Sequence, residues 1–284
     1  MPVDILTFAF MQRALISATI IGTVCAVIGV YVVLRGMAFI GAGIAHASFG
    51  GVAIGITLGV HPLFTTILFC LATAWGIAFL SEERKVREDS AVGIFFASSM
   101  AFGVLLIGIM KGYQADLFGY LFGNILAVSS FDLWSSLVIG ALVIFVVWLL
   151  FKEFLLFTFD PELARVAGLP VKMLNLLMMS MIAVTIVISI KSVGIVLVSA
   201  LIVTPAASAY LLSDDFKKMM LLSILIGVGS TWTGLLLSVW LNLASGPTIV
   251  MVATLIFFIC YFLSPQRRKL QRDIEELKVE VKEK

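Results

Sequence analysis

Long apolar segments recur along this chain, and they constrain its fold more than any other feature. About 20 apolar residues in a helix cross the roughly 30 Å of hydrocarbon in a bilayer. Segments of that kind lie near residues 8–34, 38–59, 62–80, 90–110, 131–151, 173–190, 193–212, 218–241 and 246–263. Only 13% of the 284 residues are charged, about half the share of a soluble domain. We therefore predict an all-α, polytopic membrane protein of about nine transmembrane helices, within a range of eight to ten.

The segment at residues 113–128 is too short and too polar to cross the membrane. We expect it to form a short helix near the external mouth, where other parts of the protein must cover its backbone. With nine spans and an external N-terminus, sixteen Lys and Arg residues fall on the cytoplasmic side and three on the outer side. Because basic loops stay in the cytoplasm, we expect a multi-pass protein of the cell membrane with a cytoplasmic C-terminus.

The chain changes character after residue 264. Residues 1–264 form the predicted membrane domain, whereas residues 265–284 are mostly charged. In this tail, apolar residues are spaced four, three and four apart, at Leu270, Ile274, Leu277 and Val281. The spacing predicts a short amphipathic cytoplasmic helix. Packing on the membrane domain or on a partner is favoured over a dimerising coil, because two heptads are marginal.

An ionisable group deep in an apolar span is costly and is usually functional. His46 is the exception among the predicted spans, which otherwise contain hardly any such group. It lies in the most glycine-rich span, with Gly43 and Gly50 on its face. One hypothesis is that small neighbours leave room for an ion or water beside the imidazole, a common ligand of transition metals. The alternative is close helix packing, with the imidazole hydrogen-bonded to a neighbouring helix.

The sequence contains no Gly-rich phosphate-binding loop of the G-x-x-x-x-G-K-[ST] type. It also shows no carboxylate at the centre of a span, where a proton-coupled carrier normally has one. We therefore expect no enzymatic activity in this chain. If transport is active, its energy comes from ATP hydrolysis by a separate subunit.

A short helix is predicted in the loop between the spans that end near residue 151 and begin near residue 173. Asp160 followed by Pro161 is a typical helix start, and Gly168 is a typical stop. The spacing Glu162-x-Ala164-x-x-x-Gly168 resembles the coupling-helix motif of ABC importer permeases. We therefore expect the coupling residues to be Asp160, Glu162, Ala164, Arg165 and Gly168.

Over its membrane portion the chain resembles the permeases of ABC importers for zinc, manganese and iron. Six segments carry the resemblance in order, at residues 40–53, 88–94, 116–126, 159–168, 201–207 and 245–250. The resemblance implies a homodimeric permease, two cytoplasmic ABC ATPase subunits and an extracytoplasmic metal-binding protein. Many relatives have an Asp four residues before the histidine, where this chain has Ala42. His46 is therefore the one metal ligand that the resemblance transfers.

The leading functional hypothesis is import of divalent transition-metal ions by alternating access, with zinc placed first and manganese or iron as alternatives. No permanently bound cofactor and no nucleic acid are expected, only the transported metal ion, lipid and the partner subunits. A second hypothesis is a permease for a metal chelate, such as a siderophore or corrinoid. A third is an ion-coupled carrier or membrane scaffold outside the ABC class.

Overall fold

The computed structural model describes residues 8–82, 86–109 and 117–264, and these residues form helices, turns and loops without any strand. Nine helices in this part are long and apolar enough to span a membrane, which confirms the predicted number. They are α1 (Ala9–Leu34), α2 (Ala38–Leu58), α3 (Pro62–Glu82), α4 (Glu88–Ile109), α6 (Ser130–Leu149), α9 (Val171–Val193), α10 (Ile195–Leu212), α11 (Phe216–Leu241) and α12 (Ser245–Leu263). The predicted tail helix at 265–284 lies outside the described residues.

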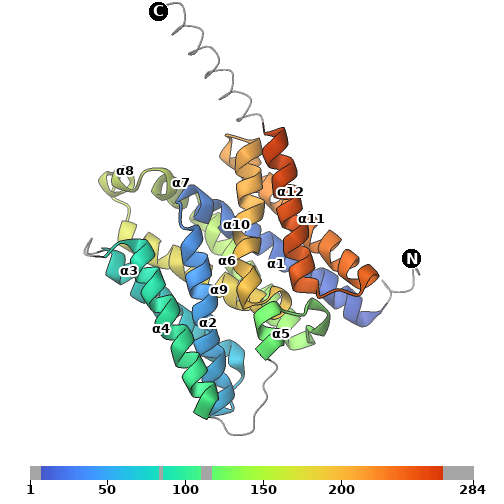
Figure 1. Ribbon diagram of the computed structural model, residues 1–284. Coiled ribbons are helices and arrows are strands. Elements are labelled where there is room, and N and C mark those ends of the chain that lie inside the picture. Colours follow the sequence, from blue (N-terminus) through green and yellow to red (C-terminus); the bar gives the residue numbers. More distant parts are fainter. Residues whose placement is uncertain (1–7, 83–85, 110–116, 265–284) are drawn as a thin grey trace, which may run out of the picture.

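Three of the spans form the interior of the bundle. Helices α1, α2 and α9 are the most buried, whereas α4, α6 and α12 expose most of their length. Helix α2 packs along α3 and α4, while α1 packs along α10 and α11 (Figure 1). Helix α9 contacts both groups, since it packs against α3 and also against α1. The sides of the outer helices that carry large exposed apolar residues are suited to lipid.

Glycines bring α1 into close contact with α11. A methyl group on Gly22 would lie 3.0 Å from the carbonyl oxygen of Gly227, and one on Gly227 would lie 2.7 Å from that of Gly22. At the same crossing, Thr231 Oγ1 donates a hydrogen bond to the Ala18 carbonyl over 3.1 Å. Small residues allow this approach, and interhelical hydrogen bonds add to the packing in lipid.

The segment between α4 and α6 does not span, as predicted. Its described part consists of the six-residue helix α5 (Leu117–Phe122) and the 3-10 helix η2 (Ile125–Ala127). Gly123 and Gly194 adopt positive φ angles of 70° and 98°, and their backbones meet. A methyl group on Gly246 would lie 2.1 Å from the Phe122 carbonyl oxygen. The α9–α10 turn and the start of α12 therefore provide the protein cover that this segment needs.

At the opposite end of the bundle lie α7 (Phe151–Phe159) and α8 (Pro161–Val166) (Figure 1). Helix α7 follows directly after α6, across a break at Leu150, where φ is −103° and ψ is 26°. Phe154 and Phe157 are buried, and the Phe154 ring packs 5.9 Å from the ring of Tyr31 in α1. These contacts fix α7, and α8 with it, to the end of α1.

Candidate functional site

His46 lies near the middle of α2 and is half-buried. Its ring meets the ring of Phe96 in α4 edge-on, with centroids 4.9 Å apart and an interplanar angle of 85°. Its Nδ1 atom is buried and has no hydrogen-bond partner among the described residues. No neighbouring helix among the described residues therefore holds Nδ1 by a hydrogen bond. A buried, unpaired imidazole nitrogen can accept a hydrogen bond from water or bind a metal ion.

The glycines beside His46 have a different role from the one expected. A methyl group on Gly43 would lie 2.3 Å from Val92 Cγ1 in α4, and one on Gly50 would lie 2.9 Å from both Phe69 and the Ser99 carbonyl oxygen. The expectation that Gly43 and Gly50 leave room beside the ring is therefore wrong, because α3 and α4 fill that space. Open space is found at Gly41, five residues before His46, where a methyl group would meet nothing within 4 Å.

Few further metal ligands surround His46. Among the described residues no group of three or more His, Cys, Asp or Glu side chains is arranged to hold a metal ion. Ala42, one helical turn before His46, contributes no ligand atom from its side chain. In the part of the chain that the structure describes, His46 is therefore not a member of such a group.

The predicted coupling helix is present as α8. The Asp160 carboxylate caps its N-terminus by accepting a hydrogen bond from the Leu163 N–H over 2.9 Å, and Pro161 occupies the first turn. Glu162 and Arg165 form an exposed ion pair of 3.0 Å one turn apart. Gly168 ends the segment with φ of +82° and open space around it. The start and stop signals in the sequence therefore gave the correct local structure.

Two features of α8 differ from what the motif alone indicates. Ala164 is fully buried, so it packs α8 against the bundle and presents no surface to a partner. Leu163 and Val166, which the motif does not include, are 52% and 85% exposed. Their apolar character on a helix too short to span was the signal that could have identified them. Helix α8 thus offers an exposed apolar and charged face.

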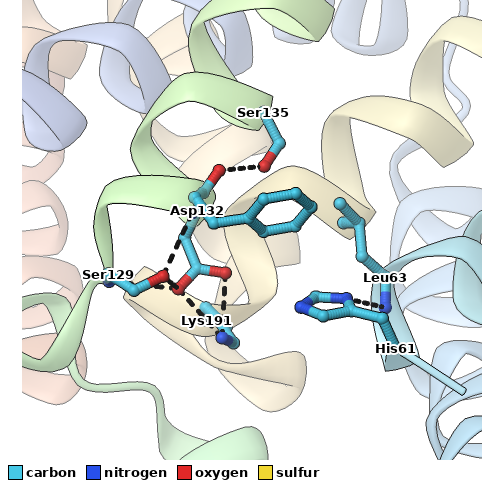
Figure 2. A network of polar contacts seen from close by, with 7 residues as sticks. His61, Leu63, Ser129, Asp132, Ser135 and Lys191 are labelled. Carbon is cyan, nitrogen blue, oxygen red and sulfur yellow. Dashed lines mark hydrogen bonds and ion pairs between the residues drawn. The ribbon is translucent and has the colours of Figure 1, made fainter.

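A polar cluster at the α5 end of the bundle was not predicted (Figure 2). Lys191 in α9 donates hydrogen bonds of 2.8 and 2.9 Å to the two carboxylate oxygens of Asp132 in α6. The same carboxylate accepts hydrogen bonds from the hydroxyl and the backbone N–H of Ser129, completing a capping box. The side chain of Asp132 is only 10% exposed and that of Lys191 43%. The spans therefore contain an ion pair near their ends in addition to His46.

His61, in the turn between α2 and α3, is exposed but also takes part in this region. Its Nδ1 accepts a hydrogen bond of 3.3 Å from the Leu63 N–H, and its ring packs 4.7 Å from the ring of Phe131. Figure 2 shows the other ring nitrogen turned towards Asp132 and Lys191. A narrow cavity of about 60 Å³ lies between these three side chains.

Comparisons with known proteins show two relatives that match nearly the whole chain. The chain is 40% identical over 269 residues to a protein of Halalkalibacterium halodurans named manganese transport system membrane protein MntC, covering 95% of this chain and 92% of that protein. It is 39% identical over 268 residues to the manganese import system permease protein ScaB of Streptococcus gordonii, covering 94% and 96%.

Two solved structures share the fold. PsaBC from Streptococcus pneumoniae in complex with Fab matches with a TM-score of 0.86 at 36% identity, over 95% of this chain and 97% of that chain. A metal-chelate type ABC transporter in an inward-facing conformation matches with a TM-score of 0.72 at 16% identity, over 91% and 87%. At that identity the second match shows the fold alone. The model of the ABC 3 transport family matches residues 7–264, and the chain belongs to that family.

Proposed function

We propose that this chain is the permease subunit of an ATP-driven importer of manganese ions. The observation that carries the proposal is the identity of 39–41% with relatives named for manganese transport, over nearly the whole length of both proteins. Zinc, which the sequence placed first, has no support among these relatives. Carbonyl and water oxygens suit manganese, whereas imidazole suits several other transition metals, so the proposal requires oxygen ligands in addition to His46.

His46 is the proposed contact for the metal in transit. Its unpaired Nδ1 and its position at mid-span support this role. One imidazole without a neighbouring carboxylate binds weakly, which favours release over storage. The edge contact with Phe96 also couples the ring to α4, so that a movement of α4 against α2 changes the surroundings of His46.

The proposed assembly contains a second copy of the chain, ABC ATPase subunits at α8 and a metal-binding protein at the α5 end. The exposed face of α8 supports the ATPase position, with Glu162, Leu163, Arg165 and Val166 at the surface and Ala164 holding the helix in place. In this orientation the nine long helices cross the cell membrane, α8 lies on the cytoplasmic side, and the chain ends in the cytoplasm. No ATP hydrolysis is assigned to the permease itself.

Uptake by the reconstituted complex tests this function. Proteoliposomes that contain the permease and its ATPase, with the metal-binding protein outside, should accumulate manganese when ATP is enclosed in the lumen on the cytoplasmic side, and excess zinc or iron should compete poorly. Preferred uptake of zinc, or of a siderophore or corrinoid, would identify a different cargo. Uptake driven by an ion gradient without ATP hydrolysis would place the chain outside this mechanism.

Variants of His46 test the metal contact in the same vesicles. His46→Ala should reduce uptake by at least about tenfold, equivalent to about 1.4 kcal/mol, with unchanged assembly. His46→Gln keeps hydrogen-bonding capacity but does not replace the imidazole ligand, so it should reduce uptake to the same extent as His46→Ala. Wild-type uptake by His46→Gln would show that the imidazole serves hydrogen bonding and not metal contact.

A further inference from the structure

Arg35 occupies the short connection between α1 and α2, which contains only residues 35–37. Its backbone N–H donates a hydrogen bond of 3.0 Å to the Tyr31 carbonyl, and the Met37 N–H donates one of 2.9 Å to the Val32 carbonyl. Met37 is only 3% exposed. The connection is therefore held tightly to the last turn of α1, and only Gly36 and Met37 separate Arg35 from the start of α2.

The side chain of Arg35 contacts the segment that supports α8. The guanidinium carbon lies 3.9 Å from the centre of the Phe157 ring, which is a cation–π contact. Phe157 is buried in α7, three residues before Asp160, which caps α8. Arg35 therefore joins the base of α8 to the start of α2.

The same guanidinium borders a cavity of about 410 Å³ that separates α8 from α4. Glu88 at the start of α4, Arg165 in α8, and Lys172 and Asn175 in α9 also line this cavity. The Nη1 atom of Arg35 is buried and finds no hydrogen-bond partner in the part of the chain that the structure describes. A buried charged donor without a partner is costly, so its persistence calls for a partner in another state.

Glu88 is the carboxylate among the described residues that line this cavity. Burial lowers the pKa of the Arg35 guanidinium below its ordinary value, and the charge of Glu88 opposes that shift. The two side chains thus attract each other across the cavity but form no direct contact in this state. Closing the cavity would create a charge-assisted hydrogen bond, which is among the stronger polar interactions in proteins.

We propose that Arg35 is a positioning residue that transmits movements of α7 and α8 to α2 and α4, by pairing with Glu88 in one state of the transport cycle and releasing it in another. The inference rests on the proposed function, since it requires an ATPase that moves α8. It explains how a movement at α8 reaches the metal contact, because α2 and α4 carry His46 and Phe96, whose rings touch.

Coupling between transport and ATP hydrolysis provides the first test. In proteoliposomes of the whole complex, Arg35→Gln and Glu88→Gln should each lower the manganese ions moved per ATP at least fivefold. Arg35→Lys, which keeps the charge, should recover more than half of the wild-type ratio. Lys217→Gln, the control, removes an exposed charge at the start of α11 and should leave the number of manganese ions moved per ATP unchanged. A wild-type ratio in both Gln variants would overturn the proposal.

A cysteine pair at positions 35 and 88 provides the second test and does not depend on uptake. Its disulfide should form at least fivefold faster in one of two trapped states of the complex, nucleotide-free or ATP with vanadate. Equal rates in the two states would overturn the inference. If Arg35→Gln does not fold, Glu88→Gln carries the first test, because Glu88 is exposed. Absence of manganese uptake by the wild-type complex would instead contradict the proposed function.

Discussion

Two short segments connect spans without crossing the membrane. One is covered by the rest of the protein, and the other exposes a face. The outer one, residues 117–128, is held by backbone contacts between Gly123, Gly194 and Gly246. The inner one, α7 and α8, is anchored by buried Phe154, Phe157 and Ala164 but exposes the remaining face of α8. The outer segment is therefore built as part of the scaffold, whereas the inner segment is built to be contacted by another molecule.

The two segments differ in how closely neighbouring atoms approach their glycines. In the outer segment, a Cβ atom on Gly123 would lie 2.4 Å from the backbone nitrogen of Gly194, and one on Gly194 would lie 2.6 Å from that of Gly123. At the end of the inner segment, Gly168 also has a positive φ angle, but a Cβ atom there would meet nothing within 4 Å. The same substitution should therefore lower the stability of the protein by different amounts at these glycines. This difference can be measured.

The largest effect is expected for Gly194→Val. A β-branched residue at φ of +98° is strained, and its Cβ atom would lie 2.4 Å from the Phe122 carbonyl carbon. Together, the strain and the overpacking should cost about 3 kcal/mol or more. The yield of monodisperse protein and its thermal unfolding in detergent measure this loss. A Gly194→Val protein as stable as Gly168→Val would refute the distinction between the two segments.

A smaller effect is expected for Lys191→Met at the outer end. This change leaves the largely buried Asp132 carboxylate with Ser129 but without its cation. Removing one partner of a fully buried ion pair lowers the free energy of unfolding by about 3–5 kcal/mol. Because this pair is partly exposed, the loss here should be about 2 kcal/mol. Thermal unfolding measures it, with Lys152→Met as the exposed control. The double variant with Asp132→Asn should be more stable than Lys191→Met alone.

At the inner segment we expect changes in association without changes in stability. Leu163→Ser combined with Val166→Ser removes exposed apolar surface from α8 and should weaken ATPase binding by about tenfold, or about 1.4 kcal/mol. Copurification of the ATPase and the melting temperature of the permease are the two measurements. Leu243→Ser, which alters a similarly exposed leucine at the opposite end of the bundle, is the control. An unchanged ATPase yield would show that α8 is not the contact.

Among the glycine substitutions, the smallest loss of stability is expected for Gly168→Ala. The left-handed conformation costs a non-glycine residue about 1–2 kcal/mol, and no clash adds to this. Gly168→Val should also remain folded. If α8 contacts the ATPase, however, this variant should lower the amount of manganese taken up per ATP hydrolysed. Melting temperature and coupling ratio separate the two effects. A large fall in melting temperature for Gly168→Ala would show that the segment is packed as tightly as the outer one.

Several local features of this fold could be predicted because they depend on neighbouring residues. Asp160, Pro161 and Gly168 carry their own start and stop signals, and α8 begins and ends there. The burial of Ala164 could not be predicted from the same motif, since it depends on which side of α8 faces the bundle. Likewise, the pairing of Asp132 with Lys191 joins residues 59 positions apart. The capping box at Ser129 was the one local sign of that cluster.

The sequence by itself determined the class of protein, the nine spans and the position of the short inner helix. It could do so because hydrocarbon thickness sets the length of a span and because caps act within one turn. Only the tertiary structure decided that Gly43 and Gly50 pack against α4 and α3, that Nδ1 of His46 stays unpaired, and that Arg35 rests on Phe157. These contacts arise where helices cross, and the crossing of two helices depends on both surfaces together.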